Sequence, residues 1–208
     1  VDGCAPSTSV RSDGREVVIV DAVARDFRKS HPDMQARIKF ETGIVEEELG
    51  ADGKPVYAHP GSSTRTTSGK AAFDQWYNDV PGVNTRIPIQ LELVADARDP
   101  SVYTYCTSKF FPLDGAGFGN EGRRHNYHFT VEMHLSFVYT GVGFQDFSFR
   151  GDDDVWVFIN NRLVIDLGGI HGPKSAKIDL PTVAAETGMV VGGTYPMAIF
   201  FAERHTTQ

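Results

Sequence analysis

Three consecutive aspartates stand directly before two apolar segments that are joined by a pair of asparagines. The aspartates are Asp152, Asp153 and Asp154, the apolar segments are 155–159 and 163–165, and Asn160-Asn161 lies between the segments. Branched and aromatic residues on both sides of two turn-forming residues predict a β-hairpin. Asparagine adopts positive φ more readily than most residues, which suits a two-residue turn. The carboxylates therefore stand at the rigid end of a strand.

Three carboxylates this close together repel one another, and folding holds them closer still. Such a run is compatible with a solvated loop, or with a site where a cation neutralises the charges. Ca²⁺ binds carboxylate, carbonyl and water oxygens, about 6–8 of them in flexible geometry, so it is the candidate ion here. The spacing differs from the Ca²⁺ loop of an EF-hand, which places its acidic ligands at alternate positions. The triplet alone leaves the solvated loop as the alternative.

A series of longer motifs follows the order found in a known family. These motifs cover residues 23–27, 30–33, 73–84, 110–115, 118–120, 125–130, 151–172 and 195–206. Together they resemble the fibro-slime domain, which is related to the PA14 module. The resemblance implies an all-β fold, an antiparallel β-sandwich of PA14 type with long loops and one or two short helices. It implies a single domain over 1–208, with an N-terminal extension at 1–15.

The resemblance also implies a metal site. In PA14-like adhesins two adjacent aspartates, often joined by a cis peptide bond, hold a Ca²⁺ ion that binds neighbouring hydroxyls of a sugar. Asp152 and Asp153 match that pair. Asp154 stands where the wider family often has glycine, which leaves it either as a further ligand or as an outward charge. The glycine-rich segment 167–173 allows close backbone approach, so we expect a carbonyl oxygen there, with Gly169 as the candidate, to complete the metal site.

Three further residues are candidates for hydrogen bonds to sugar hydroxyls. His171 follows the predicted hairpin, and Arg204 and His205 lie in the C-terminal motif. The alternative is that they tie neighbouring loops together. Trp76 and Tyr77 follow Phe73 at helical spacing, which favours packing in the core over stacking on a sugar.

Apolar and polar residues alternate along most of the chain, which predicts strands. The clearest strand is 128–139, with Phe129 and every second residue after it facing the core. His128, Glu132 and His134 then share the opposite face, where a solvated sheet surface is favoured over a transition-metal site. Further strands are predicted at 16–27, 87–94, 102–111, 144–149, 176–180 and 195–203, and a helix at 70–79. The polar segment 41–69 is predicted to lie over the surface of the sandwich.

Composition and cysteine content restrict the classes of function. A chain of 208 residues that is 40% hydrophobic suits one substantial core. A net charge of −7 disfavours nucleic acid as a partner. No apolar run reaches the length of a membrane span, so we expect no membrane insertion. Cys4 and Cys106 make an even count, which favours a disulfide between them over two separate thiols.

The sequence therefore predicts a secreted, non-catalytic module that binds a polysaccharide or a cell-surface glycan through Ca²⁺. The alternative is a structural subunit of an extracellular filament or matrix, which assembles with other copies or subunits and has a metal site without a sugar. A glycosidase is disfavoured. The two catalytic carboxyl groups of such an enzyme stand about 5–10 Å apart across a cleft, on separate elements, whereas Asp152 and Asp153 are adjacent in the chain. In the fibro-slime pattern a further strand follows 203–206. The sequence stops at Gln208. If the further strand is absent, we expect a sheet edge to be exposed.

Overall fold

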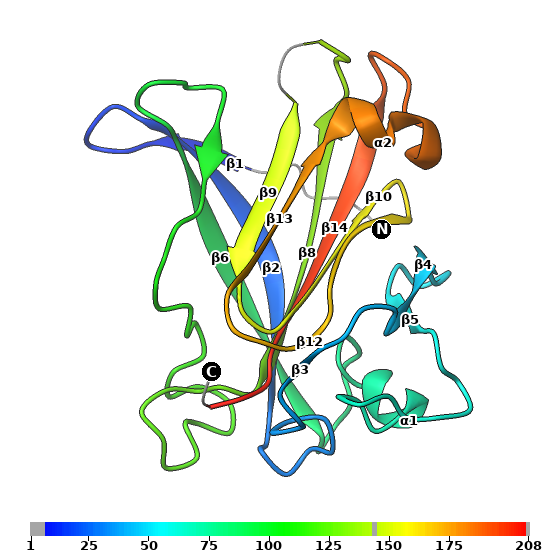
Figure 1. Ribbon diagram of the computed structural model, residues 1–208. Coiled ribbons are helices and arrows are strands. Elements are labelled where there is room, and N and C mark those ends of the chain that lie inside the picture. Colours follow the sequence, from blue (N-terminus) through cyan, green and yellow to red (C-terminus); the bar gives the residue numbers. More distant parts are fainter. Residues whose placement is uncertain (1–6, 143–144, 207–208) are drawn as a thin grey trace.

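The computed structural model describes residues 7–142 and 145–206 (Figure 1). Strands dominate the described residues, and two short helices accompany them. In chain order the elements are β1 (Ser7–Val10), β2 (Glu16–Phe27), β3 (Lys39–Phe40), β4 (Val45–Leu49), β5 (Pro55–Tyr57), α1 (Lys70–Phe73), β6 (Asn84–Ala95), β7 (Tyr103–Thr104), β8 (Phe129–Val138), β9 (Asp146–Gly151), β10 (Asp154–Ile159), β11 (Arg162–Leu167), β12 (Gly169–Ile170), β13 (Lys174–Asp179), α2 (Leu180–Thr187) and β14 (Thr194–Glu203).

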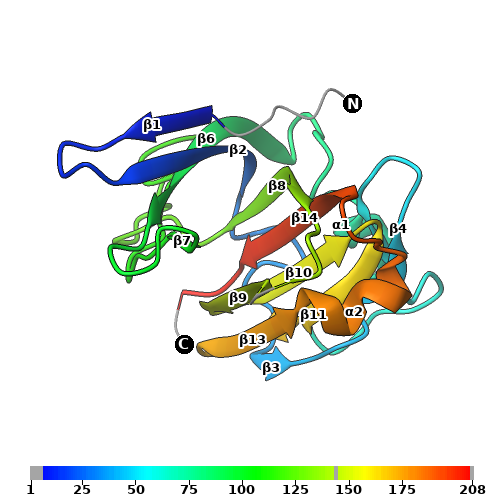
Figure 2. The same ribbon diagram turned by 90° about the horizontal axis from the view of Figure 1, so that it is seen from above.

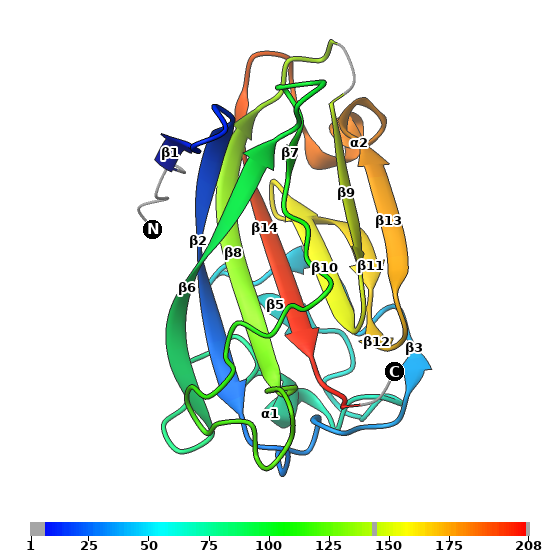
Figure 3. The same ribbon diagram turned by 90° about the vertical axis from the view of Figure 1, so that its left-hand side faces the viewer.

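One large antiparallel sheet organises the molecule. Its strands follow the order β5-β4-β11-β10-β14-β8-β2-β6-β7, and β1 pairs with β2 beside this path. The two-stranded sheets β9–β13 and β3–β12 complete the fold. The β9–β13 pair lies against one face of the large sheet (Figures 2 and 3). The predicted all-β, sandwich-like fold is confirmed.

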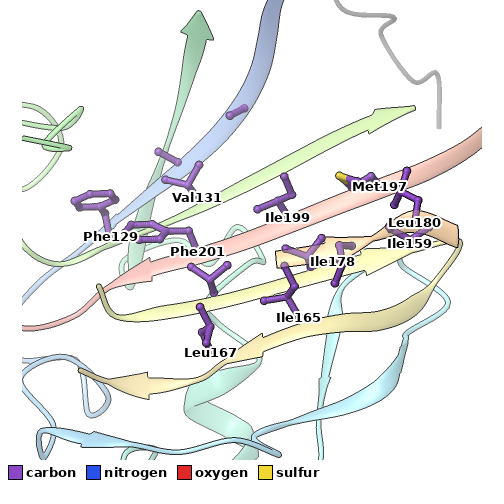
Figure 4. Close-up of a cluster of buried hydrophobic side chains, with 14 of the residues drawn as sticks. Phe129, Val131, Ile159, Ile165, Leu167, Ile178, Leu180, Met197, Ile199 and Phe201 are labelled. Atoms are coloured by element: carbon purple, nitrogen blue, oxygen red, sulfur yellow. The ribbon is translucent and has the colours of Figure 1, made fainter. Parts of the chain in front are cut away.

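The first hydrophobic core fills the space between the large sheet and the β9–β13 pair. Ile165, Ile199 and Phe201 from the large sheet meet Ile178 and Leu180 there (Figure 4). The side chains that alternation predicted to face inward from β8 also contact this core. Burial of such side chains stabilises the fold by about 1.5–3 kcal/mol each.

A second core lies on the opposite face of the central strands. Trp156, Phe158 and Phe200 alternate with first-core residues along β10 and β14, so both strands are buried on both faces. This explains why their sequences are almost continuously apolar. The segment 41–69, predicted to lie over the surface, instead adds β4 and β5 to the sheet and buries Ile44 and Tyr57 in this core. That prediction was wrong because a few large side chains outweigh the polar majority of the segment.

The predicted hairpin is confirmed as β10 and β11. Asn160 and Asn161 form its turn with φ of 48° and 67°, the positive values that a two-residue hairpin turn requires. Ile159 pairs with Arg162 across the turn. The strand predicted at 16–27 has the same bounds as β2.

The predicted helix at 70–79 is shorter in the structure. Regular α-helix stops at Phe73, and the following bonds are single turns. The Asn84 side-chain amide donates to the Gln75 and Asn78 carbonyl oxygens at 2.9 and 2.8 Å, so it takes acceptors that a longer helix would use. Phe73, Trp76 and Tyr77 are nevertheless buried, as their spacing predicted.

Candidate functional site

The acidic triplet and the C-terminal motif lie side by side at one end of the central sheet. Asp154 begins β10 and pairs with Ala202, next to the last residue of the antiparallel β14. The loop between β11 and β12 reaches the same end, where β12 pairs with β3 (Figure 1). Strand register therefore brings residues 152–154, 167–171 and 203–205 together.

Asp154 and Arg204 form a buried ion pair below this end of the sheet. Both side chains are 0% exposed. Arg204 Nε donates to Asp154 Oδ2 at 2.6 Å, and Arg204 Nη2 donates to Oδ1 at 3.0 Å. The remaining Arg204 nitrogen, Nη1, donates to the carbonyl oxygens of Thr66 at 2.6 Å and Asp33 at 3.2 Å. The guanidinium also lies 4.6 Å from the ring centre of Trp76.

This geometry gives the environment of two of the predicted site residues. Arg204 has no exposed surface to offer a sugar, so its alternative role, holding loops together, is the one observed. Asp154 is neither outward nor free to bind an ion, because Arg204 occupies both oxygens and the Gly169 N–H donates to Oδ1 at 2.6 Å. The sequence alone did not predict this ion pair, because 50 residues separate Asp154 from Arg204.

Asp153 precedes Asp154 in the chain and is also fully buried. Its Oδ2 accepts a hydrogen bond from the Arg204 backbone N–H at 2.6 Å, and its Oδ1 accepts one from the His171 N–H at 3.3 Å. None of the described peptide bonds is cis. The turn is made instead by a φ of 54° at Asp153, a conformation that aspartate tolerates better than most residues.

Glu203 is a site residue that the sequence analysis did not select. Its side chain is 8% exposed. Burial, followed by the negative charges of Asp153 and Asp152, raises the pKa of Glu203 to about 10. Its place at the end of a buried strand, one residue before Arg204, was the available signal. The buried Glu203 carboxyl at the end of β14 thus lies close enough to Asp152 and Asp153, between β9 and β10, to feel their charges.

The predicted sugar-binding histidines occupy different environments. His171 is buried, with Nε2 3.1 Å from the Leu167 carbonyl oxygen and Nδ1 2.9 Å from that of Gly172. It therefore holds its own loop, the alternative role that the sequence left open, and contact of His171 with a sugar stays a prediction. Asp152 and His205 are partly exposed and remain accessible to a ligand.

Gly169 shapes the loop beside Asp154. Its φ is +86°, and a Cβ there would collide with the Lys39 carbonyl oxygen and lie 2.7 Å from the Glu41 nitrogen. We expect Gly169→Ala to lower the free energy of unfolding by about 1–3 kcal/mol, because backbone must shift and positive φ is strained. Urea unfolding against Gly172→Ala, where a Cβ meets open space, measures this. Equal losses of free energy of unfolding in Gly169→Ala and Gly172→Ala would contradict this prediction.

Other predictions fall outside what the structure decides. Within the described residues, no three His, Cys, Asp or Glu side chains are already arranged to hold a metal ion. Cys106 is exposed, and Cys4 lies outside the described residues, so their disulfide stays a prediction. No helix in the described part of the chain is long and apolar enough to span a membrane.

Comparison with known proteins identifies the C-terminal part of the chain. Residues 120–208 match the sequence model of the PA14 domain. The chain carries a PA14-related domain. The predicted resemblance is thereby confirmed, and the match includes the whole acidic site. PA14 domains include carbohydrate-binding and adhesion modules, which gives the coarse functional class.

The PA14-related chain is also similar to three proteins of Dictyostelium discoideum. Protein psiR is 36% identical over 96% of this chain, protein psiQ is 40% identical over 80%, and protein psiD is 42% identical over 80%. The chain spans 21%, 17% and 34% of the lengths of these relatives. A solved structure, an anti-sigma factor domain-containing protein, aligns with 99% of the chain at 10% identity and a TM-score of 0.26, too low to support any inference.

Proposed function

We propose that this PA14-related domain is a non-catalytic module that binds a polysaccharide or cell-surface glycan outside the cell, through a Ca²⁺ ion held by Asp152, Asp153 and Glu203. The observation that carries the proposal is a buried Glu203 carboxyl close to two aspartates: burial, followed by the negative charges of Asp153 and Asp152, raises the pKa of Glu203 to about 10. A buried carboxyl beside two aspartates is costly unless a proton or a cation compensates the charge.

The donor atoms of the site fit Ca²⁺. Carboxylate oxygens are hard ligands, and Ca²⁺ accepts carbonyl and water oxygens in the remaining positions. An ion there would supply a place for two neighbouring sugar hydroxyls. Gly169 is held within this site through its bond to Asp154, so a carbonyl ligand from its loop stays part of the proposal.

The surrounding residues prepare the site without contacting the ligand. The Arg204 and His171 backbone N–H groups hold the two oxygens of Asp153. The Asp154–Arg204 pair fixes the strand ends from which these groups project. Partly exposed Asp152 and His205 remain on the outside, where a hydroxyl group can approach.

Two competing functions receive less support from the geometry. The carboxyl groups lie together at one strand end, whereas glycosidase carboxyls flank the scissile bond from opposite sides. For a filament subunit, the sequence suggested an exposed edge beside the C-terminal motif. β14, which leads into this motif, pairs with β10 on one side and β8 on the other, so it is not itself an edge strand, and the expected exposed edge stays a prediction.

Calorimetric titration of Ca²⁺ into EDTA-treated protein tests the proposal. We expect saturable binding that falls at least tenfold in Glu203→Gln and is lost in Asp152→Asn/Asp153→Asn, because each change removes a charged ligand. Glu46→Gln/Glu47→Gln, on the exposed side of β4, is the matched control and should bind normally. Circular dichroism establishes that each variant is folded.

The outcome separates the remaining alternatives. Absence of Ca²⁺ binding by folded wild-type protein would overturn the metal part of the proposal. Ca²⁺ binding without Ca²⁺-dependent retention on any glycan column would favour the structural-subunit alternative.

A further inference from the structure

Exposed cations gather around the acidic end of the sheet. None of the following forms an ion pair among the described residues: Arg28, Lys29, Arg37, Lys39, Arg123 and Arg124. Some cations on other parts of the molecule have carboxylate partners, whereas others, such as Arg11 and Arg98, are exposed and form no ion pair among the described residues. Those paired residues are Arg15, Arg25, Lys54, Lys70, Arg86, Arg162 and Lys177. The unpaired cations near the site thus have charge available for a ligand.

One group of these cations lies beside the C-terminal motif. The Lys29 N–H donates to Glu121 Oε2 at 2.6 Å, and the Arg28 guanidinium lies 4.1 Å from the Phe118 ring centre. These contacts join the end of β2 to the loop that carries Arg123 and Arg124.

Gln35 connects this first group to the acidic site. Its N–H donates to the Arg204 carbonyl oxygen at 2.8 Å, and its side-chain nitrogen lies 2.8 Å from His128 Nε2. His128 in turn lies 3.4 Å from Glu121. The loop bearing Arg123 and Arg124 therefore borders the site on this side.

A second group lies on the other side of the acidic centre. Lys39 belongs to β3 and pairs with Ile170 in β12, one residue before His171, whose N–H holds Asp153. Lys174 Nζ lies 4.2 Å from the ring centre of Phe40, and that ring packs against His171 at 5.4 Å. Figures 1 and 3 show β3, β12 and the C-terminal end of β14 at the same end of the molecule.

We infer that the glycan taken by this site is an acidic polysaccharide, one that carries carboxylate or sulfate groups. The inference rests on the proposed function and adds the ligand class to it. A net charge of −7 repels a polyanion on average, so local cations must guide it to one place. Arginine forms bidentate hydrogen bonds with carboxylate and sulfate-like oxyanions, and lysine supplies a compact positive charge. Arg28, Arg123 and Arg124 belong to the group on one side of the proposed Ca²⁺ site. Lys39 and Lys174 belong to the group on the other side.

Affinity electrophoresis in gels containing polygalacturonate, with Ca²⁺ present, tests the inference. A gel with the fully methyl-esterified polymer has the same sugar backbone without its charge, and a heparin gel presents sulfate. We expect retardation in at least one acidic gel and none in the esterified gel. Arg123→Gln/Arg124→Gln should weaken binding to the acidic polymer about tenfold, because two exposed charge pairs with the polymer are lost.

Arg11→Gln/Arg98→Gln is the matched control. Both arginines are exposed and unpaired, and neither belongs to the groups that border the acidic site. The control changes net charge equally and should alter retardation less than twofold. Equal weakening by both variants, retardation by the esterified polymer alone, or no retardation in either acidic gel would overturn the inference. Equally strong retardation by single-stranded DNA would overturn it too, since the cations would then bind any polyanion.

The Ca²⁺ titration keeps this inference separable from the proposed function. Normal Ca²⁺ binding with retention only on neutral glycans overturns the inference and leaves the proposed function intact. If the protein binds no Ca²⁺ and an acidic polymer still retards it in EDTA, the Ca²⁺ part of the proposed function is overturned. The inference that the ligand is acidic is then still supported.

Discussion

Arg204→Met is expected to lower the free energy of unfolding by about 3–5 kcal/mol, because it leaves the Asp154 carboxylate buried without its partner. Methionine retains much of the volume of the side chain, so the loss comes mainly from charge and hydrogen bonding. The carbonyl oxygens of Thr66 and Asp33 also lose their donor. Urea unfolding followed by tryptophan fluorescence measures the change.

Two further variants show whether the unpaired charge is responsible. Asp154→Asn/Arg204→Met removes the charge and should recover part of the lost stability. Arg162→Met breaks an exposed ion pair with Glu48 and should cost less than about 1 kcal/mol. If Arg204→Met unfolds at the wild-type urea concentration, the pair contributes nothing and our account of this region fails.

Local sequence pattern predicted the elements whose structure depends on near neighbours. In β8 the alternation from Phe129 onward sets which side chains enter the core. The β10–β11 hairpin follows from branched residues on both sides of Asn160-Asn161, whose positive φ values are a local property of asparagine. The alternation of a strand and the turn residues of a hairpin lie within about ten residues of one another, so a single sequence is sufficient to predict these elements.

The elements that sequence analysis missed depend on distant partners. Asn84 takes the Gln75 carbonyl oxygen, which would have accepted a hydrogen bond from Asp79 if α1 had continued. The strand predicted at 102–111 is reduced to β7, which pairs with only Val94 and Ala95 at the end of β6. Helical periodicity and alternation in these segments were real, but contacts made by the folded chain decided where each element ends.

The candidate site shows the same division. The run of aspartates located it, and the family resemblance selected Asp152 and Asp153. The different roles of adjacent Asp153 and Asp154 follow from the register of β10 against β14, which lets the Arg204 side chain pair with Asp154 and leaves the charge of Asp153 to raise the pKa of Glu203. No spacing within the triplet contains that information.

Glu203→Gln is expected to remove a loss of stability that the metal-free protein shows as pH rises. The pKa of Glu203 is raised from 4.5 to about 10 in the folded protein, because of burial and the charges of Asp153 and Asp152. The folded state therefore binds more protons than the unfolded state between these values. The contribution of Glu203 is fully present below about pH 4.5 and is lost as pH rises toward 10, at up to about 1.4 kcal/mol per pH unit.

Urea unfolding in EDTA between pH 7 and 9 measures this slope. In that window His128 does not interfere, because burial lowers its pKa to about 4 and it is neutral throughout. Wild-type protein should lose stability with rising pH, and Glu203→Gln should lose much less. Asp114→Asn, which changes a carboxylate exposed to solvent and paired with His125, is the control and should keep the wild-type slope. Parallel slopes for wild type and Glu203→Gln would show that Glu203 is not the responsible group.

Adding Ca²⁺ connects this pH dependence to the proposed function. A cation and a proton compensate the same negative charge, so ion binding requires Glu203 to be deprotonated and becomes tighter as pH rises. With Ca²⁺ present, the loss of stability between pH 7 and 9 should flatten or reverse in wild-type protein and stay unchanged in Glu203→Gln. A wild-type slope that is identical with and without Ca²⁺ would mean that the three carboxyl groups share a proton but hold no ion.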